Sequence, residues 1–253
     1  MKISLKTNSS SDFNLDGDNP GDFNLKPYHP GDFNLKPYPP GKFNLTSSNA
    51  RNLKSKDNRI REINILDLFS GSGSWVKGWR ESTTYKANID SVDIIKQSHV
   101  NFCMDVRDFK SDKIYDIVYA SFPCTHFSQM RNINKLKTTK EEFNTALELA
   151  KLSFEWGKKA KYAYIIENPY TGKAKNYFPN YQIVDYSLYD FPMRKRTAIW
   201  SNIDLKLKVK INGDVNYNKL PLQYIKNNAV IPEKLSKHIK WMIIKYMIKE
   251  RLK

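Results

Sequence analysis

The chain has 253 residues, of which 40% are hydrophobic and 13% aromatic, enough to bury the core of one substantial domain. Its formal net charge of +16 favours polyanionic partners such as nucleic acids. The two cysteines, Cys103 and Cys124, are too few for a disulfide framework and lack the paired spacing of a zinc site. Because no apolar run can span a bilayer and the first residues lack a signal core, we expect a soluble intracellular protein without a metal or membrane contact.

The first part of the chain repeats with a period of about ten residues. "GDFNLKPYHP" is followed by "GDFNLKPYPP" and "GKFNLTSSNA". Each unit has one Phe and one Leu and is closed by Gly and Pro, so neighbouring units bury little against each other. We expect residues 1–57 to be a disordered tail and 58–253 to be one domain. The tail is either a linker expanded by slippage or a multivalent docking segment that presents Phe and Tyr.

Strands alternate with helices after residue 60. Residues 138–160 predict a helix with Thr at its start and Glu in its first turn, and 232–253 predict an amphipathic closing helix. Apolar and β-branched segments predict seven strands, at 63–69, 86–94, 100–106, 113–122, 161–168, 181–191 and 194–203. This order predicts an α/β fold with a mostly parallel sheet and helices on both faces.

A glycine turn, "DLFSGSGSW", follows the first predicted strand. Gly71 and Gly73 let the backbone approach a ligand at the carboxyl edge of the sheet, although such a turn can also be a simple connection. Asp93 ends the next strand about twenty residues later, where a carboxylate can take ribose hydroxyls. Asp105 ends the third strand and could reach a base amino group. Either acid could instead cap a helix or lie in a solvated loop.

Cys124 lies just past the end of one predicted strand, and Glu167 lies at the end of the next. Pro123 stiffens the turn that carries Cys124 beside the crevice, a place suited to a nucleophile or to a packed small hydrophobic residue. Glu167, in "IIENP", occupies the equivalent position, where a buried carboxyl with a raised pKa can give a proton to a ring nitrogen. Cys103 lies inside a predicted strand, so we expect it to be an inert core residue.

Three basic residues, Arg194, Lys195 and Arg196, enter the last predicted strand. They could orient the Glu167 carboxyl or hold a phosphate. They could equally form a solvated patch that faces DNA without specificity.

Taken in order, "DLFSGSGSW", "FPCTHFS", "IENP", "FPMRKRTAIW" and "NNAVIPEKL" resemble the first, fourth, sixth, eighth and tenth motifs of the cytosine carbon-5 DNA methyltransferase family. They are most similar to its compact phage-type and virus-type members. The resemblance runs from Ile63 to about Leu235. Pro-Cys followed by Glu-Asn-Pro is specific, whereas the glycine turn is not. The resemblance implies a Rossmann-like fold that uses S-adenosylmethionine.

The resemblance also implies a reaction, the transfer of a methyl group to carbon 5 of a cytosine in DNA. Cys124 would add to carbon 6 of a flipped-out cytosine, and Glu167 would stabilise protonation at ring nitrogen 3. Lys195 or a neighbouring arginine would replace the arginine that usually contacts the base. The implied cofactor residues are Phe69, Ser70, Gly71, Gly73, Asp93, Asp105, Pro123 and Asn228, and the implied nucleic-acid residues are Ser128, Arg194 and Arg196.

The chain departs from the family pattern in three places. Met193, Lys195 and Thr197 stand where the family has Gln-x-Arg-x-Arg. Phe122 stands where a second proline or a glycine is common. The stretch at about 203–226 is too short for an independent target-recognition domain, which leaves the sequence specificity open.

Two other functions share these observations. One branch of the same family methylates tRNA with the same motifs, and a catalytically weak nucleic-acid-binding or regulatory protein could keep the fold. The presence of both Cys124 and Glu167 favours an enzyme. Amino-group methylation fits poorly because a thiol replaces the aromatic residue of the Pro-Pro-Tyr/Phe loop. A cysteine hydrolase fits poorly because His126 is only two residues from Cys124. The target site, the process served and the oligomeric state remain open.

Overall fold

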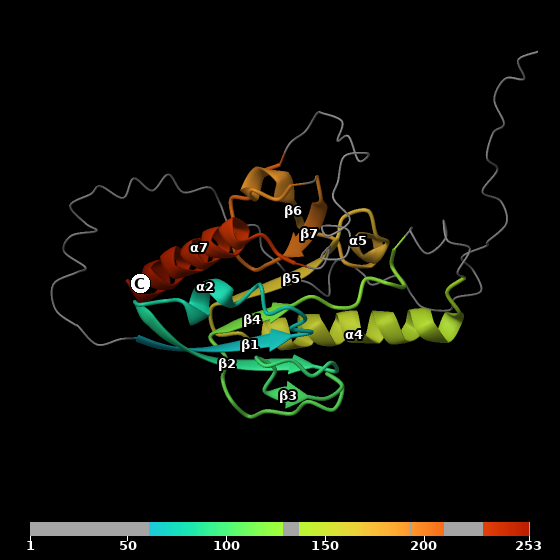
Figure 1. Ribbon diagram of the computed structural model, residues 1–253, viewed down its shortest axis with the longest axis horizontal. Helices are drawn as coiled ribbons and strands as arrows, with labels where there is room; N and C mark the ends of the chain where they lie inside the picture. The colour runs from blue at the N-terminus through green and yellow to red at the C-terminus, as the bar shows by residue number, and fades with distance from the viewer. Residues whose placement is uncertain (1–60, 129–136, 193, 210–229, 253) are drawn as a thin grey trace, which may run out of the picture. The chain divides into compact units, whose positions relative to one another are not determined.

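The computed structural model describes residues 61–128, 137–192, 194–209 and 230–252 (Figure 1). All of them belong to one compact unit, Leu35–Lys253. The predicted tail at 1–57, Met193, Asn228 and most of the predicted recognition region lie outside the described residues.

In the described part of the chain, seven strands form one sheet in the order β3-β2-β1-β4-β5-β7-β6. β7 runs antiparallel to both β5 and β6, while the other neighbours are parallel. The predicted mostly parallel α/β sheet is therefore confirmed. The strands are β1 Arg61–Leu68, β2 Tyr85–Asp93, β3 Phe102–Cys103, β4 Ile117–Ala120, β5 Ala163–Pro169, β6 Gln182–Asp185 and β7 Arg196–Trp200.

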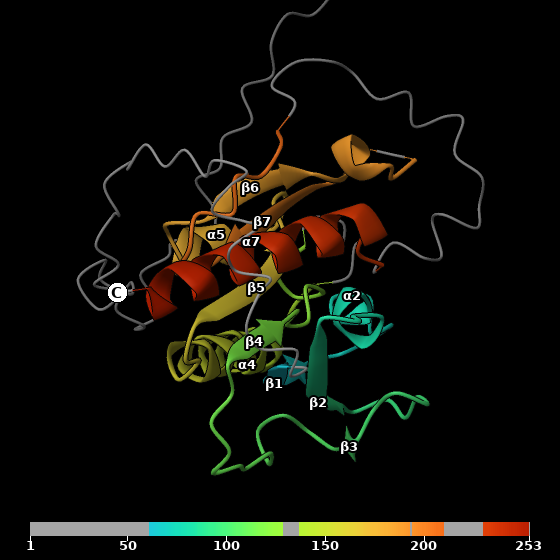
Figure 2. The ribbon, with the colours of Figure 1, turned by 90° about the vertical axis from the view of Figure 1, so that its left-hand side faces the viewer.

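Helices cover both faces of the sheet (Figure 2). The helical elements are α2 Lys77–Arg80, α4 Lys140–Lys158, α5 Ala174–Tyr177, the 3-10 turn η3 Tyr186–Tyr189 and α7 Glu233–Arg251. Because side chains alternate along a strand, β4 and β5 present one set of residues to α7 and α2 and the other set to α4. Both faces of these central strands are thus buried, which is why their sequences are almost continuously apolar.

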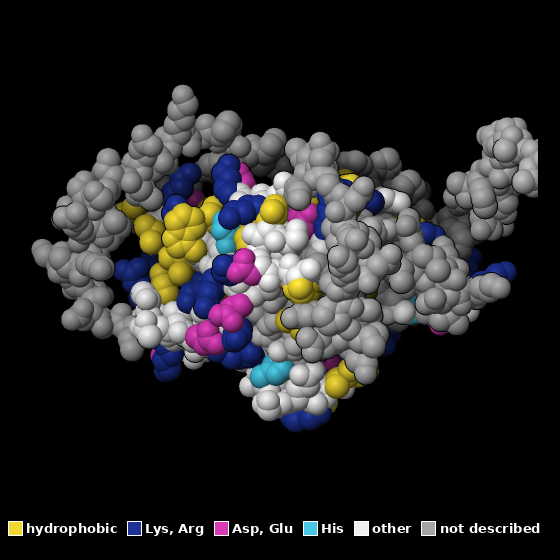
Figure 3. All heavy atoms as spheres, turned by 45° about the horizontal axis from the view of Figure 1, so that its top comes forward, with side chains coloured by type: hydrophobic (Ala, Val, Ile, Leu, Met, Phe, Trp, Pro, Cys, Tyr) yellow, Lys and Arg dark blue, Asp and Glu magenta, His cyan; other side chains and the backbone are white. Residues whose placement is uncertain are grey.

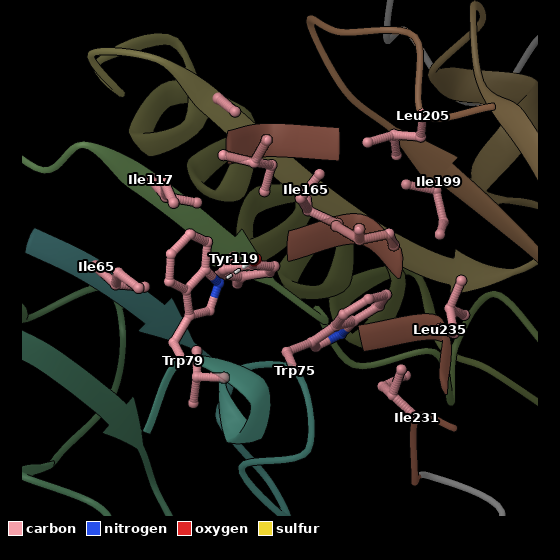
Figure 4. Packing of buried hydrophobic residues seen from close by; sticks show 14 of the residues in the cluster. Ile65, Trp75, Trp79, Ile117, Tyr119, Ile165, Ile199, Leu205, Ile231 and Leu235 are labelled. Atoms are coloured by element: carbon pink, nitrogen blue, oxygen red, sulfur yellow. Dashed lines mark hydrogen bonds between the residues drawn. The ribbon is translucent and has the colours of Figure 1, made fainter. Parts of the chain in front are cut away.

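The largest apolar cluster lies between the sheet and the helices α2 and α7 (Figure 4). The indole Nε1 of Trp79 donates to the hydroxyl of Tyr119 over 2.8 Å, and the ring of Trp75 stacks on Tyr119. The hydroxyl of Ser236 in α7 donates to the backbone carbonyl of Trp75 over 2.8 Å. These bonds satisfy polar atoms that would otherwise be costly in an apolar interior, and they fix α7 against the segment that follows the glycine turn.

The start of α4 agrees with its sequence signal. The hydroxyl of Thr139 accepts from the backbone N–H of Glu142 over 3.2 Å, and the Glu142 carboxylate accepts from the Thr139 N–H over 2.9 Å. This reciprocal pair satisfies two of the backbone donors that every helix start leaves without a helical partner.

Several predicted elements are shorter than their apolar patterns suggested. β3 has two residues, β4 has four, and the segment after β6 turns into η3 instead of continuing as a strand. The prediction that Cys103 is an inert core residue is wrong, because its side chain is exposed. β3 lies at one edge of the sheet, and both of its residues are exposed.

Within the described ranges, none of the helices combines the length and the apolar character needed to cross a membrane. No group of three or more His, Cys, Asp or Glu side chains in the same ranges could hold a metal ion. Lys and Arg side chains are distributed over the face shown in Figure 3 instead of forming one isolated spot.

Candidate active site

The candidate site lies where the carboxyl ends of β1, β2, β4 and β5 meet. The glycine turn follows β1, Asp93 ends β2, Cys124 follows β4, and Glu167 lies near the end of β5. Parallel strands bring their carboxyl ends to one edge, and α/β proteins bind ligands there. The fold thus brings together residues that are up to about one hundred positions apart in the sequence.

The glycine turn has an unusual backbone conformation. Phe69, Gly71 and Gly73 all have positive φ angles, of 55°, 51° and 66°. A Cβ atom at Gly73 would lie 2.8 Å from the Arg80 guanidinium and 2.9 Å from the His99 ring, so a side chain here would be strained by the positive φ and would displace one or both of these side chains. A left-handed non-glycine residue such as Phe69 is costly and is found preferentially at ligand sites.

Asp93 holds this turn in place. One carboxylate oxygen accepts from the backbone N–H of Gly71 over 2.8 Å, and the other accepts from the N–H of Ile95 over 2.8 Å. Asp93 is therefore where the sequence predicted it, but its observed contacts are to the backbone of the protein. Each carboxylate oxygen has more than one acceptor site, so these bonds leave acceptor capacity for ligand hydroxyls.

Asp67, inside β1, was not predicted to belong to the site. Its side chain is 1% exposed, and its Oδ2 accepts from the Ser70 hydroxyl over 2.6 Å. Burial raises the pKa of Asp67 to about 7, although the Ser70 hydrogen bond and the charge of Arg80 act in the opposite direction. The feature of the sequence that could have revealed it is an acidic residue in the middle of an otherwise apolar strand. The hydroxyl of Ser70, a predicted cofactor residue, is directed to Asp67.

Asp105 lies two residues after β3, at the same end of the sheet. Its carboxylate accepts from Nε and Nη2 of Arg107 over 3.0 and 2.7 Å, and from the Arg107 backbone N–H over 2.8 Å. The Arg107 hydrogen bonds hold the pKa of Asp105 below its usual range. The amino group of a base bound here would donate to a carboxylate that already accepts hydrogen bonds from Arg107.

The loop that carries Cys124 is anchored on both sides. The carbonyl of Cys124 accepts from the N–H of Phe127 over 3.1 Å. The Asn168 side chain donates to the carbonyl of Phe122 over 3.0 Å, so the residue next to Glu167 holds the loop to β5. Pro123 lies exposed between these two anchors. The rigid loop keeps the Cys124 thiol at a fixed place on the sheet edge.

Phe122, where the family commonly has a proline or a glycine, has a packing role. Its buried ring contacts those of Phe127, Phe178 and Trp200, with centroids 5.6, 6.4 and 6.2 Å away. These rings belong to the α4 side of the sheet. Phe122 therefore fixes the loop by burying apolar surface beneath it.

Cys124, Glu167 and Lys195 act on one another electrostatically. Burial raises the pKa of the Cys124 thiol, the Glu167 charge raises it further, and the Lys195 charge lowers it. Glu167 is 7% exposed, and burial raises the pKa of its carboxyl while Lys195 and a hydrogen bond with Ser121 lower it. The side chains of these three residues therefore lie close enough to influence one another's charge.

The neighbouring basic residues have different surroundings. In the pairing of β5 with β7, Glu167 lies opposite Ile199, and Lys195, four positions before Ile199 and just ahead of β7, follows the alternation of the same face. The guanidinium Nε of Arg194 donates instead to the buried Asp185 over 3.1 Å. Arg196, which begins β7, is half-buried, as is Ser128 at the end of the Cys124 loop.

No protein-family model matches the chain. The "Probable DNA (cytosine-5)-methyltransferase" of Frog virus 3 (isolate Goorha) is 35% identical to it over 167 residues, which are 56% of this chain and 72% of the relative. The chain belongs to the DNA (cytosine-5)-methyltransferase family. This confirms the family resemblance of the ordered motifs.

Two solved structures were also compared with this family member. An Entamoeba histolytica methyltransferase, EhMeth, has a TM-score of 0.39 and 13% identity, covering 67% of this chain and 66% of its own. The DhpI–SAM–HEP complex has a TM-score of 0.27 and 16% identity, covering 59% of this chain and 66% of its own. The chain thus spans just under two thirds of each of those chains.

Proposed function

We propose that this member of the DNA (cytosine-5)-methyltransferase family transfers a methyl group from S-adenosylmethionine to carbon 5 of cytosine in DNA, through a covalent bond to Cys124. The observation that carries the proposal is the electrostatic grouping of Cys124, Glu167 and Lys195 at the carboxyl edge of the sheet. A half-buried thiol, a buried carboxyl and a cation match the three tasks of nucleophile, proton donor and charge stabiliser.

The residues beside β1 and β2 fit the cofactor. The left-handed turn at Phe69, Gly71 and Gly73 brings backbone close to the sheet edge without side chains at the glycines. Asp93 fixes this turn and retains acceptor capacity for ribose hydroxyls. When bound there, S-adenosylmethionine supplies an electrophilic sulfonium methyl group.

Cys124 starts the reaction as a thiolate. Its sulfur forms a bond to carbon 6 of the cytosine, and the electron pair of the 5,6 double bond becomes available at carbon 5. The positive charge of Lys195 favours the thiolate and offsets part of the cost of burial. After carbon 5 is methylated, its proton leaves to a base, the electrons of that C–H bond restore the double bond, and the carbon–sulfur bond breaks to regenerate the thiolate.

Glu167 acts on the other side of the ring. Burial raises the pKa of its carboxyl, so it can hold a proton closer to neutral pH and donate it to ring nitrogen 3 as charge develops there. A base stacked in a duplex cannot reach both Cys124 and Glu167, so the cytosine must be flipped out or come from a single strand.

Labelled S-adenosylmethionine would be incubated with the protein and separate DNA and RNA substrates, followed by digestion to nucleosides. We expect label in 5-methyldeoxycytidine, its loss in Cys124→Ala and its retention in Cys103→Ala, which changes the exposed cysteine of β3. DNA that contains 5-fluorocytosine should trap a covalent complex, because fluorine cannot leave as the proton does. Label in RNA would instead indicate an RNA cytosine methyltransferase, as in the branch of the family that methylates tRNA. No transfer to either, despite binding of both ligands, would overturn it.

A further inference from the structure

Ser121 is the neighbour of Glu167 across two adjacent strands. β4 and β5 pair in parallel with Ala120 opposite Ile166, so the next positions bring Ser121 beside Glu167. Residues that lie opposite each other in a sheet present their side chains to the same face. The Ser121 hydroxyl therefore lies on the face from which Glu167 acts.

The Ser121 hydroxyl is held by a tryptophan. The indole Nε1 of Trp75 donates to the Ser121 Oγ over 2.8 Å. A hydroxyl has one proton to donate, and because its oxygen accepts from the indole, that proton is directed to another acceptor. The Glu167 carboxyl, which lies beside Ser121 across the β4–β5 pairing and is 7% exposed, is an acceptor on the same face.

Trp75 is a rigid anchor for this hydrogen bond. It is 4% exposed, and its ring stacks on Tyr119 with centroids 5.9 Å apart and planes at 24° (Figure 4). Its backbone carbonyl accepts from Ser236 of α7 over 2.8 Å. Trp75 also follows the glycine turn directly, so the Trp75–Ser121 bond connects the cofactor side of the site to the acid.

We propose that Ser121, held by Trp75, is a positioning residue that orients the Glu167 carboxyl toward the cytosine and sets how readily it gives up its proton. The inference rests on the methyltransferase function proposed above. A carboxyl with free rotation would present its proton to ring nitrogen 3 for only part of the time, whereas a carboxyl held by a fixed hydroxyl is already oriented.

Other groups also face Glu167, and the test leaves them in place. Lys195 lies ahead of β7, Cys124 lies in the loop after β4, and the Tyr186 hydroxyl comes from η3. A change at Ser121 removes none of these side chains. A shift in the titration of Glu167 can therefore be assigned to the lost hydroxyl.

The test compares Ser121→Ala with Ser121→Thr, which keeps the hydroxyl. Ser153→Ala is the control, because the hydroxyl of the buried Ser153 donates to the carbonyl of Leu149 within α4, on the opposite face of the sheet. Carbon-13 NMR of labelled glutamates would follow the titration of Glu167 in the free protein, with its signal assigned from Glu167→Gln. Single-turnover methylation would be measured on the same variants.

We expect Ser121→Ala to move the titration of Glu167 to higher pH, because a donor to the charged form is lost. Ser121→Thr and Ser153→Ala should titrate like the wild type. We expect the methylation rate of Ser121→Ala to fall about tenfold with no change in the KM for S-adenosylmethionine, and Ser121→Thr to restore it. Trp75→Phe should move the titration of Glu167 in the same direction by a smaller amount. If Ser121→Ala does not fold, Trp75→Phe takes its place in the test.

An unchanged Glu167 titration in Ser121→Ala or Trp75→Phe would overturn the inference. A rate loss that is equal in Ser121→Ala and Ser121→Thr would also overturn it, because that result indicates a packing effect. The NMR titration requires no turnover. A wild-type protein that transfers no methyl group would count against the proposed function, while the titration would still decide whether Ser121 acts on Glu167.

Discussion

The guanidinium Nε of Arg194 donates to the Oδ2 of Asp185 over 3.1 Å, and the Asp185 side chain is completely buried. The next residue, Lys195, instead acts on the charges of Cys124 and Glu167. Two adjacent cations in one sequence motif therefore have different tasks. The first holds the end of β6 to the start of β7, and the second belongs to the proposed active site.

Replacing these two residues separately should separate stability from catalysis. Arg194→Gln leaves the buried Asp185 carboxylate without its cation, so the free energy of unfolding should fall by about 3 kcal/mol. Lys195→Met should leave stability nearly unchanged and reduce the methylation rate strongly. Urea unfolding and single-turnover assays would measure the two effects. Equal unfolding midpoints for Arg194→Gln and the wild type would show that the ion pair is not structural.

The two glycines of the turn should differ in their tolerance of alanine. Both have positive φ, which costs an alanine about 1 kcal/mol. At Gly71 the nearest atom to a new Cβ is 3.8 Å away, but at Gly73 the Arg80 and His99 side chains lie within 2.9 Å. Gly73→Ala should therefore lower the melting temperature and the affinity for S-adenosylmethionine more than Gly71→Ala. Calorimetry would measure both quantities, and equal effects would contradict the crowding at Gly73.

Asp93→Asn should loosen the cofactor turn although it changes the side chain very little. Both carboxylate oxygens accept from backbone N–H groups, and an amide nitrogen cannot accept. One backbone donor, that of Gly71 or of the exposed Ile95, would lose its partner, and because both hydrogen bonds are only partly buried the cost should be about 1 kcal/mol. We expect weaker binding of S-adenosylmethionine and a lower unfolding midpoint. Unchanged binding would show that the turn holds its shape without this carboxylate.

Asp67 should make the protein less stable as the pH rises from 4 to 7. Its pKa in the folded state is raised to about 7, so the folded protein binds this proton more tightly than the unfolded chain does. The stabilisation is fully present below the unfolded pKa and is lost as the pH rises through 7, and amounts to about 4 kcal/mol. Asp67→Asn, which cannot titrate, should show a smaller loss over this range. Urea unfolding at several pH values would compare the two proteins, and parallel curves would contradict the assignment.

Alkylation by iodoacetamide should report the charges around Cys124. Only the thiolate reacts, and Glu167 raises the pKa of this thiol while Lys195 lowers it. Glu167→Gln should therefore speed the alkylation of Cys124 at neutral pH, and Lys195→Met should slow it. Mass spectrometry can follow both cysteines, with the exposed Cys103 as an internal reference. If Glu167→Gln slowed the alkylation of Cys124 and Lys195→Met sped it up, the two charges would not lie beside Cys124.

Local patterns in the sequence predicted much of the fold and the site. Continuous apolar runs predicted the central strands, because parallel strands are buried on both faces, and Thr139 with Glu142 predicted the start of α4. The ordered motifs predicted the family, and the positions of Cys124 and Glu167 after neighbouring strands predicted that they meet. These are properties of spacing and of residue type, which the chain carries without its tertiary contacts.

The tertiary structure decided what depends on neighbours across the sheet. Cys103 is exposed in β3, a two-residue strand at one edge of the sheet with both residues exposed, a position that its apolar surroundings in the sequence do not reveal. The pairing of β5 with β7 decides whether Arg194 or Lys195 acts on Glu167. The roles of Asp67 and Ser121 depend on the burial and hydrogen bonds around them. The sequence predicted where each strand lies, whereas the length of a strand and the face, partner and pKa of a side chain follow from the packing of segments that are distant in the chain.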